Sequence, residues 1–257
     1  MRKTTFLNHE KALIVAMVQA YTPDRVKELM DACFTEGAEG FGIQFCRIKN
    51  QYKNKEIYMD LFKYAKGLPI YVTNYRQGEN EGISDEKLAE GLLELAECGA
   101  TLCDVMGDMF DRQEDEMAKH EEAIQKQMAL IDKLHNAGAE VLMSSHIMKF
   151  TNAERVLEIA LEHQRRGADI CKIVVGADNM EEQIENLRII NLLKENLNIP
   201  FLFLCGGESH FVRRIGGELG CCMYLAVHEH DELATPAQPL LRDMKLIVSG
   251  IRGIENK

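Results

Sequence analysis

The chain has 257 residues, of which 46% are hydrophobic and 28% are charged, the balance of an ordinary globular protein. Its formal net charge of -11 argues against nucleic acid or an anionic membrane surface as a partner. No apolar run approaches the roughly 20 residues that a membrane-spanning helix needs. We therefore expect a protein that binds neither nucleic acid nor membrane.

The eight cysteines lie mostly inside apolar segments, and none of them forms a C-x-x-C pair. The first residues, MRKTTFLNHEK, lack the apolar stretch of a signal peptide. Without a secretory signal, such cysteines are better interpreted as small buried thiols than as a disulfide framework. We expect a cytoplasmic protein.

Eight short apolar runs alternate with segments of helical periodicity along the chain. The runs, each expected to be a β-strand, cover residues 12–20, 40–48, 69–75, 101–107, 140–146, 170–175, 200–205 and 221–227. The helices between them are expected at 24–36, around 58–66, at 84–98, up to about 135, and at 151–166, 180–197, 211–219 and 240–249. The charged stretch 111–126 is expected to be a solvated helix face.

This alternation predicts the α/β class and a parallel sheet. Eight strand–helix units in about 250 residues are typical of a (β/α)8 TIM barrel, so we expect one single-domain barrel over residues 1–257. An open doubly wound sheet is the alternative. It is disfavoured because no G-x-G-x-x-G follows the first run.

Lys172 lies in the middle of the apolar run Ile170-Cys171-Lys172-Ile173-Val174-Val175. Desolvation disfavours the charged form of a lysine, and a neutral amine is what Schiff-base chemistry requires. A lysine at a strand end that extends to solvent is the alternative interpretation. His146 ends the preceding predicted strand, where it could move protons beside a lysine nucleophile.

The segments around these two residues resemble those of the type I 3-dehydroquinate dehydratase family. Ser144–Thr151 (SSHIMKFT) is similar to the family's S-x-H-x-F-x-x-T-P segment, and Gly167–Val175 (GADICKIVV) is similar to G-A-D-I-x-K-I-A/V-V at the same spacing. Arg213–Gly220 resembles S-R-L-A-G-E-x-F-G, and Leu233–Pro239 resembles a lid segment, S-A-P-G-Q-I.

The resemblance implies Schiff-base dehydration of 3-dehydroquinate to 3-dehydroshikimate, with Lys172 as the nucleophile and His146 as the general acid and base. It implies that Arg214 binds the substrate carboxylate, that Gln238 closes over the substrate hydroxyls, and that Arg76 also binds substrate. It implies no metal or organic cofactor, and it makes a homodimer plausible.

Several positions depart from the family pattern. The family places a glutamate and then an arginine at the end of the second strand, where this chain has Gln44 and Arg47. The glutamate that orients the histidine corresponds to Asn80 here, so we expect Glu79 or Glu81 to take that role.

Three other functions remain open on the sequence. The same chemistry could act on a different hydroxylated keto acid, as in class I aldolases. The barrel could bind a carboxylate without converting it, with Lys172 as a fixed charge. A metal site could form at His228, Glu229, His230 and Asp231, although a contiguous run points its ligands in different directions.

Overall fold

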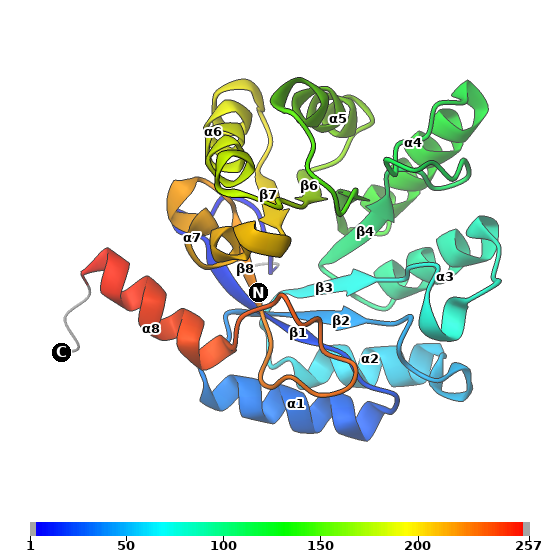
Figure 1. Cartoon of the computed structure of the whole chain (residues 1–257). Helices are drawn as coiled ribbons and strands as arrows, with labels where there is room; N and C mark the ends of the chain where they lie inside the picture. Colours follow the sequence, from blue (N-terminus) through cyan, green and yellow to red (C-terminus); the bar gives the residue numbers. More distant parts are fainter. Residues whose placement is uncertain (1–3, 254–257) are drawn as a thin grey trace.

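Eight parallel strands form a nearly closed barrel at the centre of the molecule, with the helices outside (Figure 1). The computed structural model describes residues 4–253. The strands are β1 (Leu13–Val18), β2 (Gly40–Gln44), β3 (Ile70–Thr73), β4 (Leu102–Met106), β5 (Glu140–His146), β6 (Ile170–Val175), β7 (Phe201–Cys205) and β8 (Met223–Ala226). They pair in the order β7-β6-β5-β4-β3-β2-β1-β8. A backbone hydrogen bond from Cys222 N to Phe201 O, at 2.8 Å, links the two ends of this order.

Each strand is followed by a helix, which confirms the expected TIM barrel. The helices are α1 (Pro23–Thr35), α2 (Lys55–Tyr64), α3 (Asp85–Glu97), α4 (Glu121–Asn136), α5 (Ala153–Arg165), α6 (Met180–Asn196), α7 (Val212–Leu219) and α8 (Leu241–Arg252). Short 3-10 turns, η1 (Asn50–Tyr52), η2 (Gly78–Asn80) and η3 (Gly207–Phe211), lie in three of the loops. No helix within residues 4–253 has both the length and the apolar composition that a membrane span requires.

Local sequence explains where several helices begin. The side chain of Thr22 accepts a hydrogen bond from Arg25 N, and Pro23 occupies the first turn of α1. Asn54, Asn152 and Asn179 cap α2, α5 and α6 in the same way. Because each helix presents one apolar face to the barrel, the strands are buried on both sides.

The expectation of a helical face at 111–126 is wrong for its first ten residues. Residues 107–120 form a loop between β4 and α4, and the helix begins only at Glu121. Within the loop the carboxylate of Asp111 accepts hydrogen bonds from the backbone N of Lys119 and of His120, at 2.7 and 3.0 Å. These contacts close the loop on itself and satisfy donors that a helix would otherwise use.

The pairing of β5 with β6 positions two of the expected site residues. Ser144 lies opposite Lys172, and His146 lies opposite Val174, two residues further along the strands. Because side chains alternate along a strand, His146 and Lys172 project on the same side of the sheet. His146 is the last residue of β5, at the end of the barrel where TIM barrels carry their active sites, and Lys172 lies two positions deeper, in the middle of β6.

Candidate active site

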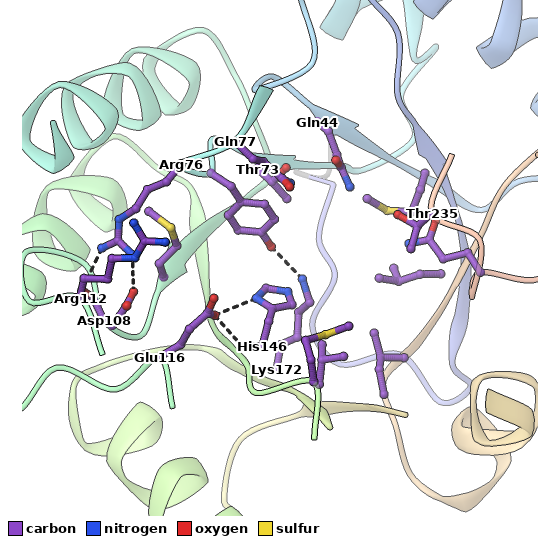
Figure 2. Close-up of a pocket in the computed structure, with 18 of the residues that line it drawn as sticks. Gln44, Thr73, Arg76, Gln77, Asp108, Arg112, Glu116, His146, Lys172 and Thr235 are labelled. Atoms are coloured by element: carbon purple, nitrogen blue, oxygen red, sulfur yellow. Dashed lines mark hydrogen bonds and ion pairs between the residues drawn. The ribbon is translucent and has the colours of Figure 1, made fainter. Parts of the chain in front are cut away.

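A cavity of about 760 Å³ opens at the carboxyl ends of the strands, and both Lys172 and His146 line it (Figure 2). Its walls differ in chemistry. One side carries ionisable groups from β5 and from the loops after β3 and β4: Arg76, Asp108, Arg112, Glu116 and His146. The other side carries neutral polar groups: Gln44, Thr73, Thr235 and Gln238. Lys172 extends from β6 between these two walls (Figure 2).

Lys172 is buried, and its Nζ has three acceptors. It donates to Tyr75 OH at 2.8 Å, to Tyr71 OH at 3.0 Å and to Asp104 Oδ2 at 3.2 Å. Three acceptors match the three N–H bonds of an ammonium group. The buried lysine thus has an acidic partner, which the apolar pattern of its own strand does not reveal.

Asp104 collects further hydrogen bonds below the cavity. Both tyrosine hydroxyls donate to its Oδ2, and Ser144 Oγ donates to its Oδ1 at 2.5 Å. Burial alone would raise the pKa of Asp104, but the charge of Lys172 and these donors bring that pKa below its usual value. Burial and the adjacent carboxylate raise the pKa values of Tyr71 and Tyr75 well above normal, so both phenols stay protonated.

His146 is held by Glu116, which comes from the β4–α4 loop (Figure 2). Glu116 Oε2 lies 2.9 Å from Nδ1 of the ring and 2.6 Å from the backbone N of His146. A carboxylate on Nδ1 fixes the ring and leaves Nε2 for a substrate proton. The ring of His146 also contacts that of Tyr75 edge to face, with centroids 5.3 Å apart.

The loop that carries Glu116 lies very close to the barrel. A Cβ at Gly107 would lie 2.5 Å from Glu116 O and 2.8 Å from Ser145 Oγ, so only glycine fits there. The buried Arg166 fixes both ends of the loop by donating to Gly107 O and Ala118 O. Glu116 itself has a positive φ of 47°, an uncommon conformation for a non-glycine residue that is often found at functional sites.

Glu79 and Glu81, the two residues expected to orient His146, lie elsewhere. Glu79 is in the η2 turn, where its Oε2 accepts a hydrogen bond from Asn50 N. Glu81 is exposed to solvent, and neither glutamate lines the cavity. The structure therefore corrects the expectation: Glu116 contacts the histidine. The sequence offered no spacing signal for it, because its loop looked like a helix.

Arg76 lines the cavity, as expected, but its guanidinium is already engaged. It forms a bidentate pair with Asp85, at 2.7 Å for each bond, and donates to Asp108 Oδ1 at 2.7 Å and to Asp108 O at 2.9 Å. Only one of its five N–H bonds remains for a ligand. Burial alone would lower the pKa of Arg76, and the two carboxylates raise it. Arg76 thus joins the loops after β3 and β4.

Arg213, rather than the expected Arg214, faces the cavity. Arg213 is buried, and its Nε donates to Cys205 O at 2.8 Å; among the side chains that the structure describes, no carboxylate pairs with its terminal amino groups. Burial lowers the pKa of its guanidinium, as expected for a cation held away from water. Arg214 is half-buried and does not line the cavity, because neighbouring residues of a helix point about 100° apart.

The neutral wall holds two buried oxygens, Gln238 Oε1 and Thr73 Oγ1, that accept no hydrogen bond from the part of the chain that the structure describes. Gln44 and Gln238, both expected to bind substrate, line this wall and are almost fully buried. Arg47, which was also expected to bind substrate, is half-buried and does not line the cavity. It lies beside the η2 turn, where its Cδ is 3.6 Å from the position of a Cβ at Gly78.

The run from His228 to Asp231 sends its side chains to different partners. Glu229 pairs with Arg25, and His230 Nε2 lies 2.8 Å from Gln238 O. His228 Nδ1 lies 3.0 Å from a carboxylate oxygen of Glu36. Within residues 4–253, no group of three or more His, Cys, Asp or Glu residues could hold a metal ion.

The similarity of this chain to known proteins points to one family. Residues 22–254 match the family model described as type I 3-dehydroquinase. A 3-dehydroquinate dehydratase of Alkaliphilus oremlandii (strain OhILAs) is 32% identical over 126 residues, 48% of this chain and 49% of that protein. A second, from Klebsiella pneumoniae (strain 342), is 31% identical over 159 residues, 60% of this chain and 58% of that protein. The matches thus span about half the length of these curated relatives.

Solved structures share the fold. The 3-dehydroquinate dehydratase of Geobacillus kaustophilus HTA426 superposes with a TM-score of 0.81 at 16% identity, over 98% of this chain and 97% of that one. At such low identity the superposition supports the barrel alone. The family model carries the stronger conclusion, since it covers nearly the whole chain, including the strands that bear Lys172 and His146. The chain belongs to the type I 3-dehydroquinase family.

Proposed function

We propose that this protein is a hydro-lyase that dehydrates 3-dehydroquinate to 3-dehydroshikimate through a Schiff base. The observation that carries the proposal is the convergence of Lys172 and His146 on one cavity, in a chain of this family. A Schiff base requires an amine nucleophile that is shielded from water, together with a nearby group that can move protons. Lys172 and His146 supply these two functions.

Lys172 attacks the substrate ketone and forms an iminium ion, which withdraws electrons from the adjacent carbon. His146, oriented through Nδ1 by Glu116, uses Nε2 to remove the proton from that carbon. The same nitrogen then protonates the departing hydroxyl group, which leaves as water. Asp104 lies 3.2 Å from Nζ and provides the counter-charge for the iminium.

Arg213 is proposed to bind the substrate carboxylate. Its forked donors suit a carboxylate, and no carboxylate among the side chains that the structure describes pairs with it. Gln238 and Thr73 carry buried acceptor oxygens that substrate hydroxyl groups can satisfy. Gln44 adds an amide that can both donate and accept.

A direct assay tests the proposal. The purified chain is mixed with 3-dehydroquinate, formation of 3-dehydroshikimate is followed by its ultraviolet absorbance, and a second sample is treated with borohydride and analysed by mass spectrometry. We expect product, and a reduced adduct on the peptide that contains Lys172. Lys172→Ala is the control and should give neither. Absence of both from a folded wild-type chain would contradict the proposal.

A second candidate is the same imine chemistry on another hydroxylated keto acid. Two observations favour it. Gln44 is neutral where the family pattern has a glutamate, and Arg76, although it matches the family arginine, is already paired with Asp85 and Asp108. A Lys172 adduct formed with other keto acids, but not with 3-dehydroquinate, would identify this case. A barrel that only binds carboxylates would form no adduct at all.

We also infer a homodimer and a cytoplasmic location. The first is supported by exposed apolar side chains on the adjacent helices α5 and α6, namely Leu161, Met180 and Ile184. The second is supported by the eight cysteines, all of which are free thiols. Light scattering on the purified chain would measure the oligomeric state, and fractionation of cells would test the location.

A further inference from the structure

Tyr75 differs in its position from the other two residues that accept a hydrogen bond from Lys172. Nζ of Lys172 donates to Tyr75, Tyr71 and Asp104, yet only Tyr75 among these three lines the cavity. Tyr71 and Asp104 are buried below it. Tyr75 also contacts the ring of His146, with centroids 5.3 Å apart. Its hydroxyl thus lies between the nucleophile, a buried carboxylate and the space that the substrate would occupy.

We propose that Tyr75 is a catalytic residue that relays protons from Lys172 and Asp104 to the oxygen of the substrate ketone while the imine forms. The inference rests on the proposed function, since it concerns the same Schiff base. A phenol suits a relay, because its oxygen can accept one proton while its O–H donates another. Tyr75 already accepts from Nζ and donates to Asp104.

The hydroxyl of Tyr75 can account for every proton that moves while the carbinolamine forms. Asp104 first takes one proton from the Lys172 ammonium, which removes two buried charges at once and leaves a neutral amine. The nitrogen then forms the N–C bond, and the C=O electron pair moves to oxygen. Tyr75 gives its proton to that oxygen and takes one from the nitrogen, so a carbinolamine forms and the tyrosine is unchanged.

The carbinolamine then loses water, and the protons again pass through Tyr75. The protonated Asp104 passes its proton to Tyr75, and Tyr75 passes its own to the carbinolamine oxygen. The C–O bond breaks, water leaves, and the nitrogen lone pair completes the C=N bond. Asp104 is again a carboxylate, now beside the iminium cation. Nitrogen has lost two protons to the departing water, and nothing is oxidised or reduced.

The raised pKa of Tyr75 agrees with this role. Because the phenol resists ionisation, it acts by exchanging one proton for another rather than as a free base. Tyr71 offers a matched control, since it also accepts from Lys172 and donates to Asp104 but lies outside the cavity lining. Loss of the Tyr71 hydroxyl therefore weakens the network without interrupting the path to the substrate.

The test measures how fast the imine forms with 3-dehydroquinate, by rapid mixing followed by borohydride quenching. We expect Tyr75→Phe to slow adduct formation about 100-fold, within the range of general acid–base catalysis. Tyr71→Phe should slow it only about fivefold, the effect of one hydrogen bond. Equal rates in the two variants would overturn the inference and leave the proposed function standing. No adduct on the wild-type chain would overturn both.

A measurement on the intact protein guards against a Tyr75→Phe chain that fails to fold. Imine formation by the wild type is compared in H2O and in D2O, at matched positions on the pH profile. We expect a slower rate in D2O, because the relay moves protons in the same steps that form and break bonds to carbon. An unchanged rate would contradict the relay whatever the variant does.

Discussion

Glu116 holds His146 at two points: its Oε2 lies 2.6 Å from the backbone N and 2.9 Å from the ring Nδ1 of the histidine. The two contacts fix both the end of β5 and the direction of the ring. The same carboxylate requires one tautomer, with the proton on Nδ1 and the lone pair on Nε2. In the proposed reaction Glu116 therefore acts through the histidine.

The first prediction concerns this pair. Glu116→Gln should lower kcat about 100-fold with little change in KM, because an amide can stabilise the wrong tautomer of His146. Glu79→Gln and Glu81→Gln are matched controls, and both should keep the wild-type kcat. A large loss of kcat in either control, with Glu116→Gln fully active, would show that Glu79 or Glu81 orients His146 instead.

The second prediction separates the two adjacent arginines of α7. Arg213→Gln should raise KM about 10- to 100-fold, because a hydrogen bond to a charged group contributes about 1.5–3 kcal/mol. Arg214→Gln should leave KM unchanged, since Arg214 does not line the cavity. Steady-state kinetics of the two variants, measured in parallel, show which arginine binds the substrate carboxylate. The reverse result would favour Arg214 as the carboxylate ligand.

The third prediction treats Arg76 as a structural clamp. Arg76→Ala leaves the almost fully buried carboxylate of Asp108 without its cation, and we expect a loss of about 3 kcal/mol in the free energy of unfolding. Arg76→Lys should recover little, because lysine lacks the fork that pairs with Asp85. Urea denaturation measures both. Full stability with a strongly raised KM would instead show that Arg76 mainly binds substrate.

The bounds of the two strands that carry His146 and Lys172 could be predicted from the sequence without error. The predicted ranges 140–146 and 170–175 coincide with β5 and β6. Each range follows a glycine that breaks the preceding helix, Gly138 or Gly167, and each contains a run of buried apolar residues. The spacing of His146 and Lys172 then placed them on neighbouring strands. These are local patterns, which periodicity can reveal.

Other parts of the site depend on contacts that no local pattern contains. Glu116 reaches His146 from a loop that has the composition of a helix, and its place depends on Gly107 and Arg166. Tyr75 reaches Lys172 across the barrel, 97 residues away in the chain. Arg214 was expected from the resemblance alone; which of the two adjacent arginines faces the cavity depends on how α7 packs against β7 and β8, which no local pattern contains.

The last prediction concerns acid stability and His163, which is buried behind the site. Its Nε2 lies 3.1 Å from Ser145 Oγ, and burial, with a smaller effect of Arg166, lowers its pKa from 6.5 to about 3. Between these two values the unfolded chain binds a proton that the folded chain does not. Stability from this group is therefore complete above pH 6.5 and falls as the pH drops toward 3.

The slope in this window should be about 1.4 kcal/mol per pH unit for this one histidine. Urea denaturation of the wild type and of His163→Gln, from pH 7 to pH 4, measures this slope. The difference between the two chains removes the contribution of the carboxylates, which titrate in both. Glutamine binds no proton, so the variant should lose stability less steeply, and the two curves should converge as the pH falls. Parallel curves would mean that His163 is protonated in the folded protein as readily as in the unfolded chain.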